Sequence, residues 1–265
     1  MHDAQQPAPR FDWLDDGFVA VIQGATRGIG LAVVRQLLAS PQPGLVVATG
    51  RSAADSAALA ELAASAGDRL LVLTVDVTDP ASIAQLAEQV ATRSDRVQLL
   101  FNVAGVLHDD TGLFPEKQLA QVDLDALERS FRVNAFGPLL VSRALAPLLL
   151  RGAPAILANL SARVGSIADN RLGGWYAYRG AKAAQNMFTR SLSIELARRS
   201  RQLACVALHP GTTDTALSAP FQARVPAEQL FSVERTAAQL LTVLAGLRAA
   251  DNGRFIAWDG SDIPW

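Results

Sequence analysis

The sequence reads Gln23-Gly24-Ala25-Thr26-Arg27-Gly28-Ile29-Gly30 after a short apolar run, residues 18–22, and at the start of a helical pattern over residues 28–39. Gly24 and Gly28 permit a tight turn and a close backbone approach, and Gly30 permits the helix to pack on the strand. The free N–H groups and the dipole at the helix N-terminus favour a pyrophosphate. We expect a dinucleotide site here, the alternative being an ordinary tight turn between strand and helix.

Strand and helix patterns alternate along the rest of the chain. Strands are expected at residues 18–22, 45–49, 70–75, 97–103, 154–160, 203–208 and 254–258. Helices are expected at 28–39, 53–66, 80–92, about 124–150 with an interruption at Gly137-Pro138, 176–199 and 233–247. This alternation predicts an α/β doubly wound, mainly parallel seven-stranded sheet (a Rossmann fold) with helices on both faces and a switch point beside the first strand. Residues 1–16 are expected to be a flexible tail, with packing of Phe11 and Trp13 on the body as the alternative. Residues 17–265 are expected to form one domain, with a substrate lid at about 212–232.

Composition excludes several classes of function. The formal net charge of −1 over 265 residues gives no basic field for nucleic acid or an anionic membrane. The most apolar run, residues 139–150, is broken by polar residues and Pro147, so no membrane span is expected. The N-terminus does not resemble a signal peptide, and the single Cys205 forms no internal disulfide, which favours the cytoplasm. No metal-ligand cluster is found in the sequence.

Two arginines indicate the choice of cofactor. Folds that prefer NAD place a carboxylate after the second strand to bind the ribose hydroxyls, whereas this sequence has Arg51 there and no carboxylate before Asp55. Arg51 and Arg27 are expected to bind a 2′-phosphate, and hence NADP(H), the alternative being two solvated side chains. Asp76, followed by Val77, ends the third strand and is placed for the adenine amine. A helix-capping role before Pro80 is the alternative for Asp76.

Tyr178 and Lys182 form the candidate catalytic pair. Only two of the 24 basic residues are lysines and only two residues are tyrosines, yet one of each lies within this five-residue segment. Four residues apart on a helix, the two side chains share one face. A nearby ammonium favours the phenolate form of a tyrosine, so the pair suits proton transfer at a substrate oxygen. The alternative is a helix that carries an aromatic residue and a solvated lysine.

With these motifs the chain resembles the short-chain dehydrogenase/reductase superfamily over residues 17–265. The motifs stand in the family's order: the glycine turn at 24–30, Asp76, Asn102-Val103-Ala104-Gly105, Asn134, Ser161, Tyr178 with Lys182, and Pro210-Gly211. Residues 161–170, 208–215 and 258–265 resemble the C-factor-like branch. The sequence departs from the family where Val103 replaces an Asn, where Ala181 and Leu160 replace serines, and in a longer interval between Ser161 and Tyr178.

The resemblance implies roles for these residues. Ser161 would hydrogen-bond the substrate oxygen, Lys182 would also hold the nicotinamide ribose, and Asn134 would hold a water in a proton relay. The turn at Pro210-Gly211 would bring the backbone of Thr213 and the hydroxyl of Thr215 to the carboxamide. The residues expected to contact the cofactor are Gly24, Thr26, Arg27, Gly28, Ile29, Gly30, Arg51, Asp76, Val77, Asn102, Ala104, Gly105, Tyr178, Lys182, Pro210, Gly211, Thr213 and Thr215.

The function expected from the sequence is therefore an NADP(H)-dependent carbonyl reductase or alcohol dehydrogenase. One alternative is a C-factor-like signalling protein that binds the dinucleotide with little turnover, and another is a dehydratase or epimerase. Leu217, Phe221 and Val225 of the lid, with Leu113 and Phe114, suggest a largely apolar small-molecule carbonyl substrate. The apolar helix over 124–150 and its expected neighbour, the Tyr178 helix, favour a homodimer or homotetramer, with a monomer as the alternative.

Overall fold

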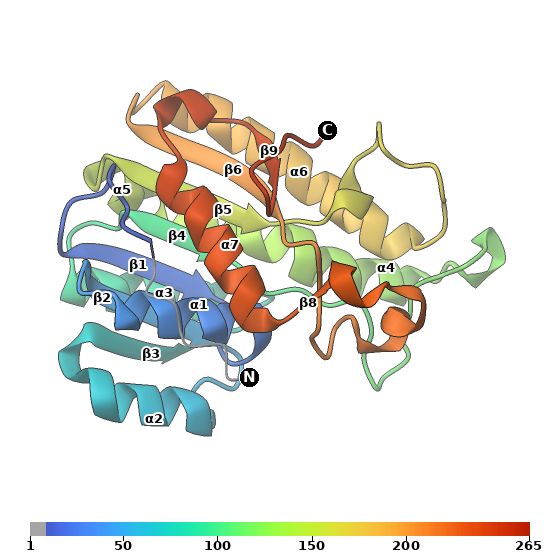
Figure 1. The fold of residues 1–265 in the computed structure, drawn as a ribbon, viewed down its shortest axis with the longest axis horizontal. Coiled ribbons are helices and arrows are strands. Elements are labelled where there is room, and N and C mark those ends of the chain that lie inside the picture. The colour runs from blue at the N-terminus through green and yellow to red at the C-terminus, as the bar shows by residue number, and fades with distance from the viewer. Residues whose placement is uncertain (1–8) are drawn as a thin grey trace.

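The computed structural model describes residues 9–265, which form one seven-stranded parallel sheet in the order β3-β2-β1-β4-β5-β6-β9 (Figure 1). The strands are β1 (Phe18–Gln23), β2 (Pro43–Gly50), β3 (Leu70–Thr74), β4 (Leu99–Asn102), β5 (Ala155–Leu160), β6 (Leu203–His209) and β9 (Phe255–Ala257). Every residue of β1 and of β5 is buried, as expected for parallel strands covered on both faces. The predicted fold class is confirmed, including the reversal of strand order beside β1.

Helices cover both faces of the sheet and enclose two separate apolar cores. On one face, in front in Figure 1, lie α1 (Gly28–Ala39) and α7 (Val233–Gly246), with α2 (Ala57–Ala66) beside β3. On the other face lie α3 (Pro80–Arg93), α5 (Gly137–Arg151) and α6 (Tyr176–Ala197). Side-chain oxygens of Ser56, Asp79 and Ser232 accept hydrogen bonds at the N-termini of α2, α3 and α7, which fixes where these helices begin.

The helical stretch between β4 and β5 is continuous, contrary to the expected break at Gly137-Pro138. It consists of α4 (Leu124–Phe131), a π-helical segment (Arg132–Phe136) and α5. The irregularity lies just before the glycine, and the helix continues because a proline fits its first turn. Among residues 9–265 this stretch is the one helix long and apolar enough to cross a membrane. The sequence did not predict such a helix, because polar residues and Pro147 interrupt the apolar run at 139–150. Val141, Leu145 and Leu149 are buried on the sheet, so packing in the core accounts for its apolar character.

Residues 9–16 pack on the body of the protein, which is the alternative considered for Phe11 and Trp13 and differs from the flexible tail expected up to residue 16. The side chains of Phe11 and Leu14 are 2% and 4% exposed and join the core on the α1 face. The Gln42 side chain accepts a hydrogen bond from Phe11 N (2.8 Å) and donates one to Phe11 O (2.9 Å). These contacts explain the difference, and the first eight residues of the expected tail lie outside the described part of the chain.

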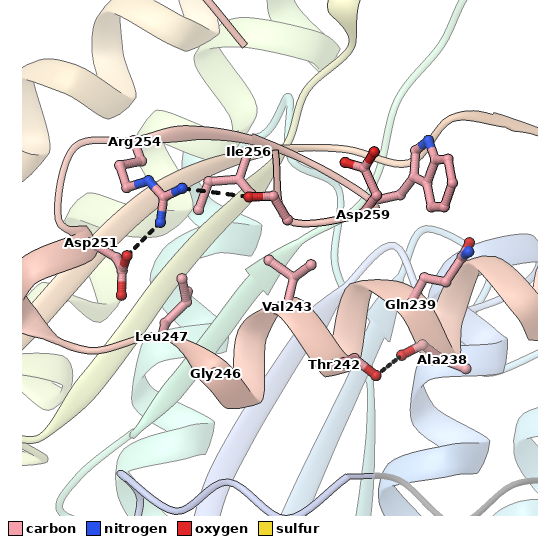
Figure 2. Close-up of a pocket in the computed structure, with 12 residues that line it drawn as sticks. Ala238, Gln239, Thr242, Val243, Gly246, Leu247, Asp251, Arg254, Ile256 and Asp259 are labelled. Atoms are coloured by element: carbon pink, nitrogen blue, oxygen red, sulfur yellow. Dashed lines mark hydrogen bonds and ion pairs between the residues drawn. The ribbon is translucent and has the colours of Figure 1, made fainter. Parts of the chain in front are cut away.

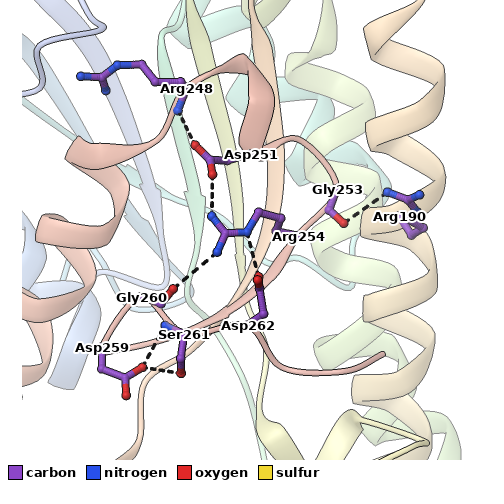
Figure 3. Close-up of polar contacts among 9 residues, drawn as sticks. All are labelled: Arg190, Arg248, Asp251, Gly253, Arg254, Asp259, Gly260, Ser261 and Asp262. Atoms are coloured by element: carbon purple, nitrogen blue, oxygen red, sulfur yellow. Dashed lines mark hydrogen bonds and ion pairs between the residues drawn. The ribbon is translucent and has the colours of Figure 1, made fainter.

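The segment after β9 returns along the sheet edge and is held by polar contacts centred on Arg254 (Figure 3). The Arg254 guanidinium donates to Asp251 (2.5 Å) and to Asp262 (2.8 Å). Further along, the main-chain oxygen of Trp265 accepts a hydrogen bond from Ala168 N (3.1 Å). Two of the three C-factor-like stretches, 161–170 and 258–265, are therefore in contact, and the C-terminal segment supports the loop that follows β5.

The carboxyl ends of the strands share one edge of the sheet, on the right in Figure 1, where the loops that bear the candidate site gather. The lid region is more ordered than the sequence indicated. Its ends form a two-stranded parallel sheet from β7 (Thr212–Thr213) and β8 (Leu230–Phe231), and 3-10 turns at Ala219–Arg224 and Ala227–Gln229 lie between them. This pairing joins the two ends of the lid to each other.

Candidate active site

The glycine turn has the geometry of a phosphate cradle. Gly24 has φ 90°, and a Cβ at this position would lie 2.5 Å from the backbone N of Ala104. A Cβ on Gly30 would collide with the carbonyl oxygen of Gly24. No side chain caps α1, so its first N–H groups point out of the helix end without a side-chain partner. The turn therefore fits a pyrophosphate lying against the start of α1.

The end of the cradle that faces the carboxyl end of β2 is positively charged and open. Arg27, just before α1, and Arg51, just after β2, are both exposed, and neither makes a salt bridge within residues 9–265. Asp76 accepts hydrogen bonds from the backbone (2.8 Å) and hydroxyl (2.7 Å) of Thr78, whereas Asp79 caps α3. The capping role considered for Asp76 thus belongs to Asp79, and Asp76 lies half-buried at the end of β3.

The residues after β4 form the wall between the cradle and the catalytic pair. Asn102 is buried, and its amide donates to Asn159 (2.8 Å) and Ser142 (3.3 Å), so its side chain supports the sheet. Ala104 packs on Gly24, as described above. A Cβ on Gly105 would lie 3.1 Å from Asn134 Oδ1 and 3.9 Å from Lys182 Nζ. The absence of a side chain at Gly105 therefore leaves open the space between the cradle and Lys182.

Tyr178 and Lys182 lie in the first two turns of α6 and are 9% and 3% exposed. Lys182 Nζ lies 5.8 Å from the centre of the Tyr178 ring and donates to Leu160 O (2.8 Å) and to Gln185 Oε1 (3.0 Å). Within residues 9–265 no group hydrogen-bonds the Tyr178 hydroxyl. The two side chains expected to act together are therefore on one face of one helix, and the phenol is free to bind a ligand.

Burial dominates the acid–base properties of this pair. It lowers the pKa of Lys182 to about 7, because an ammonium loses its hydration in the interior. Burial also raises the pKa of Tyr178 above its ordinary value, because the charged phenolate would lose its hydration in the interior. The expected effect of the ammonium on the phenol is thus outweighed by desolvation, and at neutral pH Tyr178 holds its proton.

Ser161 and Asn134 are both buried beside the pair, but each is engaged by a neighbour. Ser161 Oγ donates to Asn186 Oδ1 (2.6 Å). The Asn134 amide donates to Val106 O (2.8 Å) and accepts from Val106 N (2.9 Å), so the side chain holds the loop after β4. Asn134 lies in the π-helical segment, a feature that is frequent at functional sites.

The exit of β6 completes the site. Gly211 has φ 74°, and a Cβ there would lie 2.7 Å from the Phe231 ring, so the turn after Pro210 requires glycine. Thr213 is buried and its hydroxyl pairs with that of Thr236 (2.9 Å). Thr215 faces the cradle, since a Cβ on Gly28 would lie 3.5 Å from its methyl group. The Thr215 hydroxyl is 3.4 Å from that of Ser218 in the lid.

The structure thus brings the expected residues from β1, β2, β3, β4, β5, β6 and α6 to one edge of the sheet. The sequence did not identify Gln185 and Asn186, which hold Lys182 and Ser161. Their spacing of three and four residues after Lys182 was the available signal, because residues at this spacing share a helix face. A cavity of about 550 Å³ lies elsewhere, between α7 and the C-terminal segment near Val243, Leu247 and Asp259 (Figure 2).

A doubly wound sheet with a glycine cradle and a buried Tyr/Lys pair defines the class of dinucleotide-binding α/β enzymes. The sequence profile of the short chain dehydrogenase family matches residues 18–226. C-signal of Myxococcus xanthus is 39% identical over 169 residues, 64% of this chain and 93% of that protein. The 1-hydroxy-2-glutathionyl-2-methyl-3-butene dehydrogenase of Rhodococcus sp. (strain AD45) is 31% identical over 246 residues, 92% of this chain and 98% of that protein.

Solved structures agree with this assignment. The NADPH bound carbonyl reductase from chicken fatty liver superposes with a TM-score of 0.82 at 32% identity and covers 95% of this chain and 100% of that one. Carbonyl reductase Sniffer of D. melanogaster gives the same TM-score at 27% identity, covering 94% and 100%. The chain therefore belongs to the short-chain dehydrogenase family, as the resemblance to the C-factor-like branch predicted. It is an oxidoreductase of the kind that uses a nicotinamide dinucleotide.

Proposed function

We propose that this protein is an NADP(H)-dependent carbonyl reductase in which Tyr178 is the general acid. The observation that carries the proposal is the buried pair of Tyr178 and Lys182 at the carboxyl edge of the sheet, with no protein partner for the phenol among residues 9–265. The neighbouring carbonyl reductases, one of them described as NADPH bound, support the same reaction.

NADPH bound in the cradle would supply the hydride to the carbonyl carbon. The turn at residues 24–30 would bind the pyrophosphate, while Arg27 and Arg51 would bind the 2′-phosphate, with which a guanidinium forms charge-assisted hydrogen bonds. Asp76 would lie beside the adenine. At the other end, Lys182 would hold the nicotinamide ribose, and Thr213 and Thr215 would hold the carboxamide.

The acid–base step follows from the burial of the pair. Because burial raises the pKa of Tyr178, the phenol keeps its proton at neutral pH and can donate it to the substrate oxygen. Ser161 would turn its hydroxyl hydrogen from Asn186 to the same oxygen. Lys182, whose pKa is about 7, would then stabilise the phenolate left behind and return a proton to it.

The test is a panel of aldehydes and ketones with NADPH, followed by the loss of absorbance of the reduced nicotinamide. Turnover of apolar carbonyl compounds supports the proposal, and binding of NADPH without turnover of any of them contradicts it.

A dinucleotide-binding signalling protein is the second candidate, favoured by the 39% identity to C-signal. Binding alone needs no buried acid, whereas Tyr178, Lys182 and Ser161 are all retained together. The same panel separates the two candidates, because the signalling function predicts a measurable dissociation constant for NADPH and no carbonyl turnover.

A further inference from the structure

Four aromatic rings from three separate segments meet beside Tyr178. The Trp175 ring lies 6.3 Å from the Tyr178 ring, edge to face at 69°, and 5.0 Å from the ring of Phe221 in the lid. Phe221 also lies 5.4 Å from Phe114 and 6.0 Å from His108, both in the loop after β4. We call Trp175 and Phe221 the aromatic clasp, because they are the two rings that connect the lid to the catalytic tyrosine.

The position of Trp175 is fixed at the expense of backbone strain. Its φ and ψ of 53° and 42° are left-handed, and within residues 9–265 it is the one residue other than glycine with a positive φ. A bulky side chain is rarely found in this conformation, which persists where the surroundings enforce it and is frequent at ligand sites. The neighbouring Gly173 and Gly174 show that the chain uses glycine for the same conformation where no ring is required.

Glu116 and Arg179 supply the enforcing contacts. The N–H of Trp175 donates to the carbonyl of Glu116, and the carbonyl of Trp175 accepts from Arg179 N (2.8 Å). The Glu116 carboxylate is 4% exposed and accepts from Ala177 N (3.2 Å), so it caps α6 from the loop after β4. The backbone of Trp175 is thus fixed at the start of the helix that carries Tyr178.

The second ring of the clasp, Phe221, belongs to the lid, which is hydrogen-bonded to the loop after β4. His108 Nε2 donates to the carbonyl of Ala216 (3.0 Å), which joins the lid to the loop after β4. That bond occupies Nε2, and the other three rings are hydrocarbon surfaces apart from the indole N–H. A ligand that enters here meets the aromatic faces and edges of Trp175, Phe221 and Phe114.

We propose that the aromatic clasp selects substrates that carry an uncharged planar aryl group on the carbonyl carbon. This inference rests on the proposed carbonyl reductase function and names its substrate class. Aromatic rings attract one another edge to face and offset-stacked, beyond what apolar area alone provides, and a saturated ring of the same size lacks this attraction. The aryl ring replaces the contact between Trp175 and Phe221, and a carbonyl attached to that ring then lies next to the Tyr178 hydroxyl.

The experiment compares acetophenone with cyclohexyl methyl ketone, which have similar size but a planar and a saturated ring. Trp175→Leu is expected to lower the ratio of the two kcat/KM values about tenfold, the upper part of the range for an aromatic contact. Phe221→Leu is expected to lower it about threefold or more, by the same reasoning. Leucine keeps a bulky apolar side chain, and intrinsic reactivity cancels because each variant is compared with wild type on the same two ketones. Trp13→Leu, a ring removed from the opposite end of the domain, is the control and should leave the ratio unchanged.

A binding measurement separates this inference from the proposed function. Calorimetric titration of the NADP⁺-loaded protein gives dissociation constants for both ketones without turnover. Weaker acetophenone binding in Trp175→Leu, with cyclohexyl methyl ketone changed less than about threefold, supports the clasp even if no ketone is reduced. Ratios and dissociation constants within twofold of wild type in both Trp175→Leu and Phe221→Leu would overturn the clasp and leave the reductase proposal intact.

Discussion

Lys182 makes the stability of this protein depend on pH in a window where few other groups titrate. Burial lowers its pKa from 10.5 to about 7, so between these values the unfolded chain binds a proton that the folded protein does not. The free energy of unfolding therefore rises with pH, by about 1.4 kcal/mol per pH unit once Lys182 is mostly neutral in the folded state. From pH 7, where Lys182 is half protonated in the folded protein, to pH 8.5 the expected gain is about 1.6 kcal/mol.

The window ends at about pH 8.5 because two buried acids then act in the opposite direction. Burial raises the pKa of Cys205 from 9 to about 12 and also raises that of Tyr178, so the unfolded chain loses these protons first and stability falls with pH. Urea unfolding at pH 7.0, 7.5, 8.0 and 8.5 measures the slope. Lys182→Met is expected to remove it, and Lys117→Met, the loss of the other, exposed lysine, is expected to retain it. If the free energy of unfolding of wild type rose with pH no more steeply than that of Lys182→Met, the claim that burial lowers the pKa of Lys182 would be refuted.

Three further predictions concern cofactor choice, acid stability and assembly. Arg51→Asp should lower the ratio of kcat/KM for NADPH over NADH by about 100-fold, since a charge-assisted contact of about 1–3 kcal/mol is lost and repulsion replaces it. The control is Arg151→Asp, a charge change at another exposed arginine. An unchanged ratio in Arg51→Asp, or an equal fall in the control, argues against a 2′-phosphate site at Arg51. Burial lowers the pKa of His209 from 6.5 to about 4, so between these values the unfolded chain binds a proton that the folded protein does not. The free energy of unfolding should therefore fall by up to about 3 kcal/mol as the pH is lowered from 6.5 to 4. His209→Asn keeps an acceptor for Arg163 N and should show a smaller loss in acid urea unfolding. Met187 and Ile194 are exposed apolar side chains on α6, and we expect them to be covered in a homodimer, which light scattering would detect as twice 28.1 kDa. The double variant Met187→Glu, Ile194→Glu should give the monomer mass. A wild-type protein with the monomer mass would exclude the dimer.

The sequence predicted the sheet and its ligand-binding edge because both depend on short-range patterns. Apolar runs of strand length gave seven strands within a few residues of their bounds, and the glycines of the turn at 24–30 indicated where the backbone must pass close to its neighbours. Tyr178 and Lys182 were paired correctly because a separation of four residues fixes their relation on any helix.

What the sequence did not predict depends on contacts between distant segments. The sequence left the packing of Phe11 as an alternative only, because Gln42, which binds its backbone, lies 31 residues further along the chain. The Glu116 carboxylate caps a helix that begins 60 residues later, and neither segment contains a signal for the other. The direction of the Tyr178 pKa likewise follows from the depth of burial, which is a property of the folded protein and not of the spacing from Lys182.

The most direct test of the central claim is the activity of Tyr178→Phe against that of Tyr176→Phe. Both changes remove one hydroxyl from the first turn of α6, but Tyr176 is 41% exposed and Tyr178 is buried. With saturating NADPH and a ketone that wild type reduces, Tyr178→Phe is expected to lower kcat at least about 100-fold, the scale of general acid catalysis, with the dissociation constant for NADPH unchanged. Tyr176→Phe is expected to remain within about twofold of wild type, since its hydroxyl lies outside the site. A kcat for Tyr178→Phe within threefold of wild type would contradict the assignment of Tyr178 as the acid.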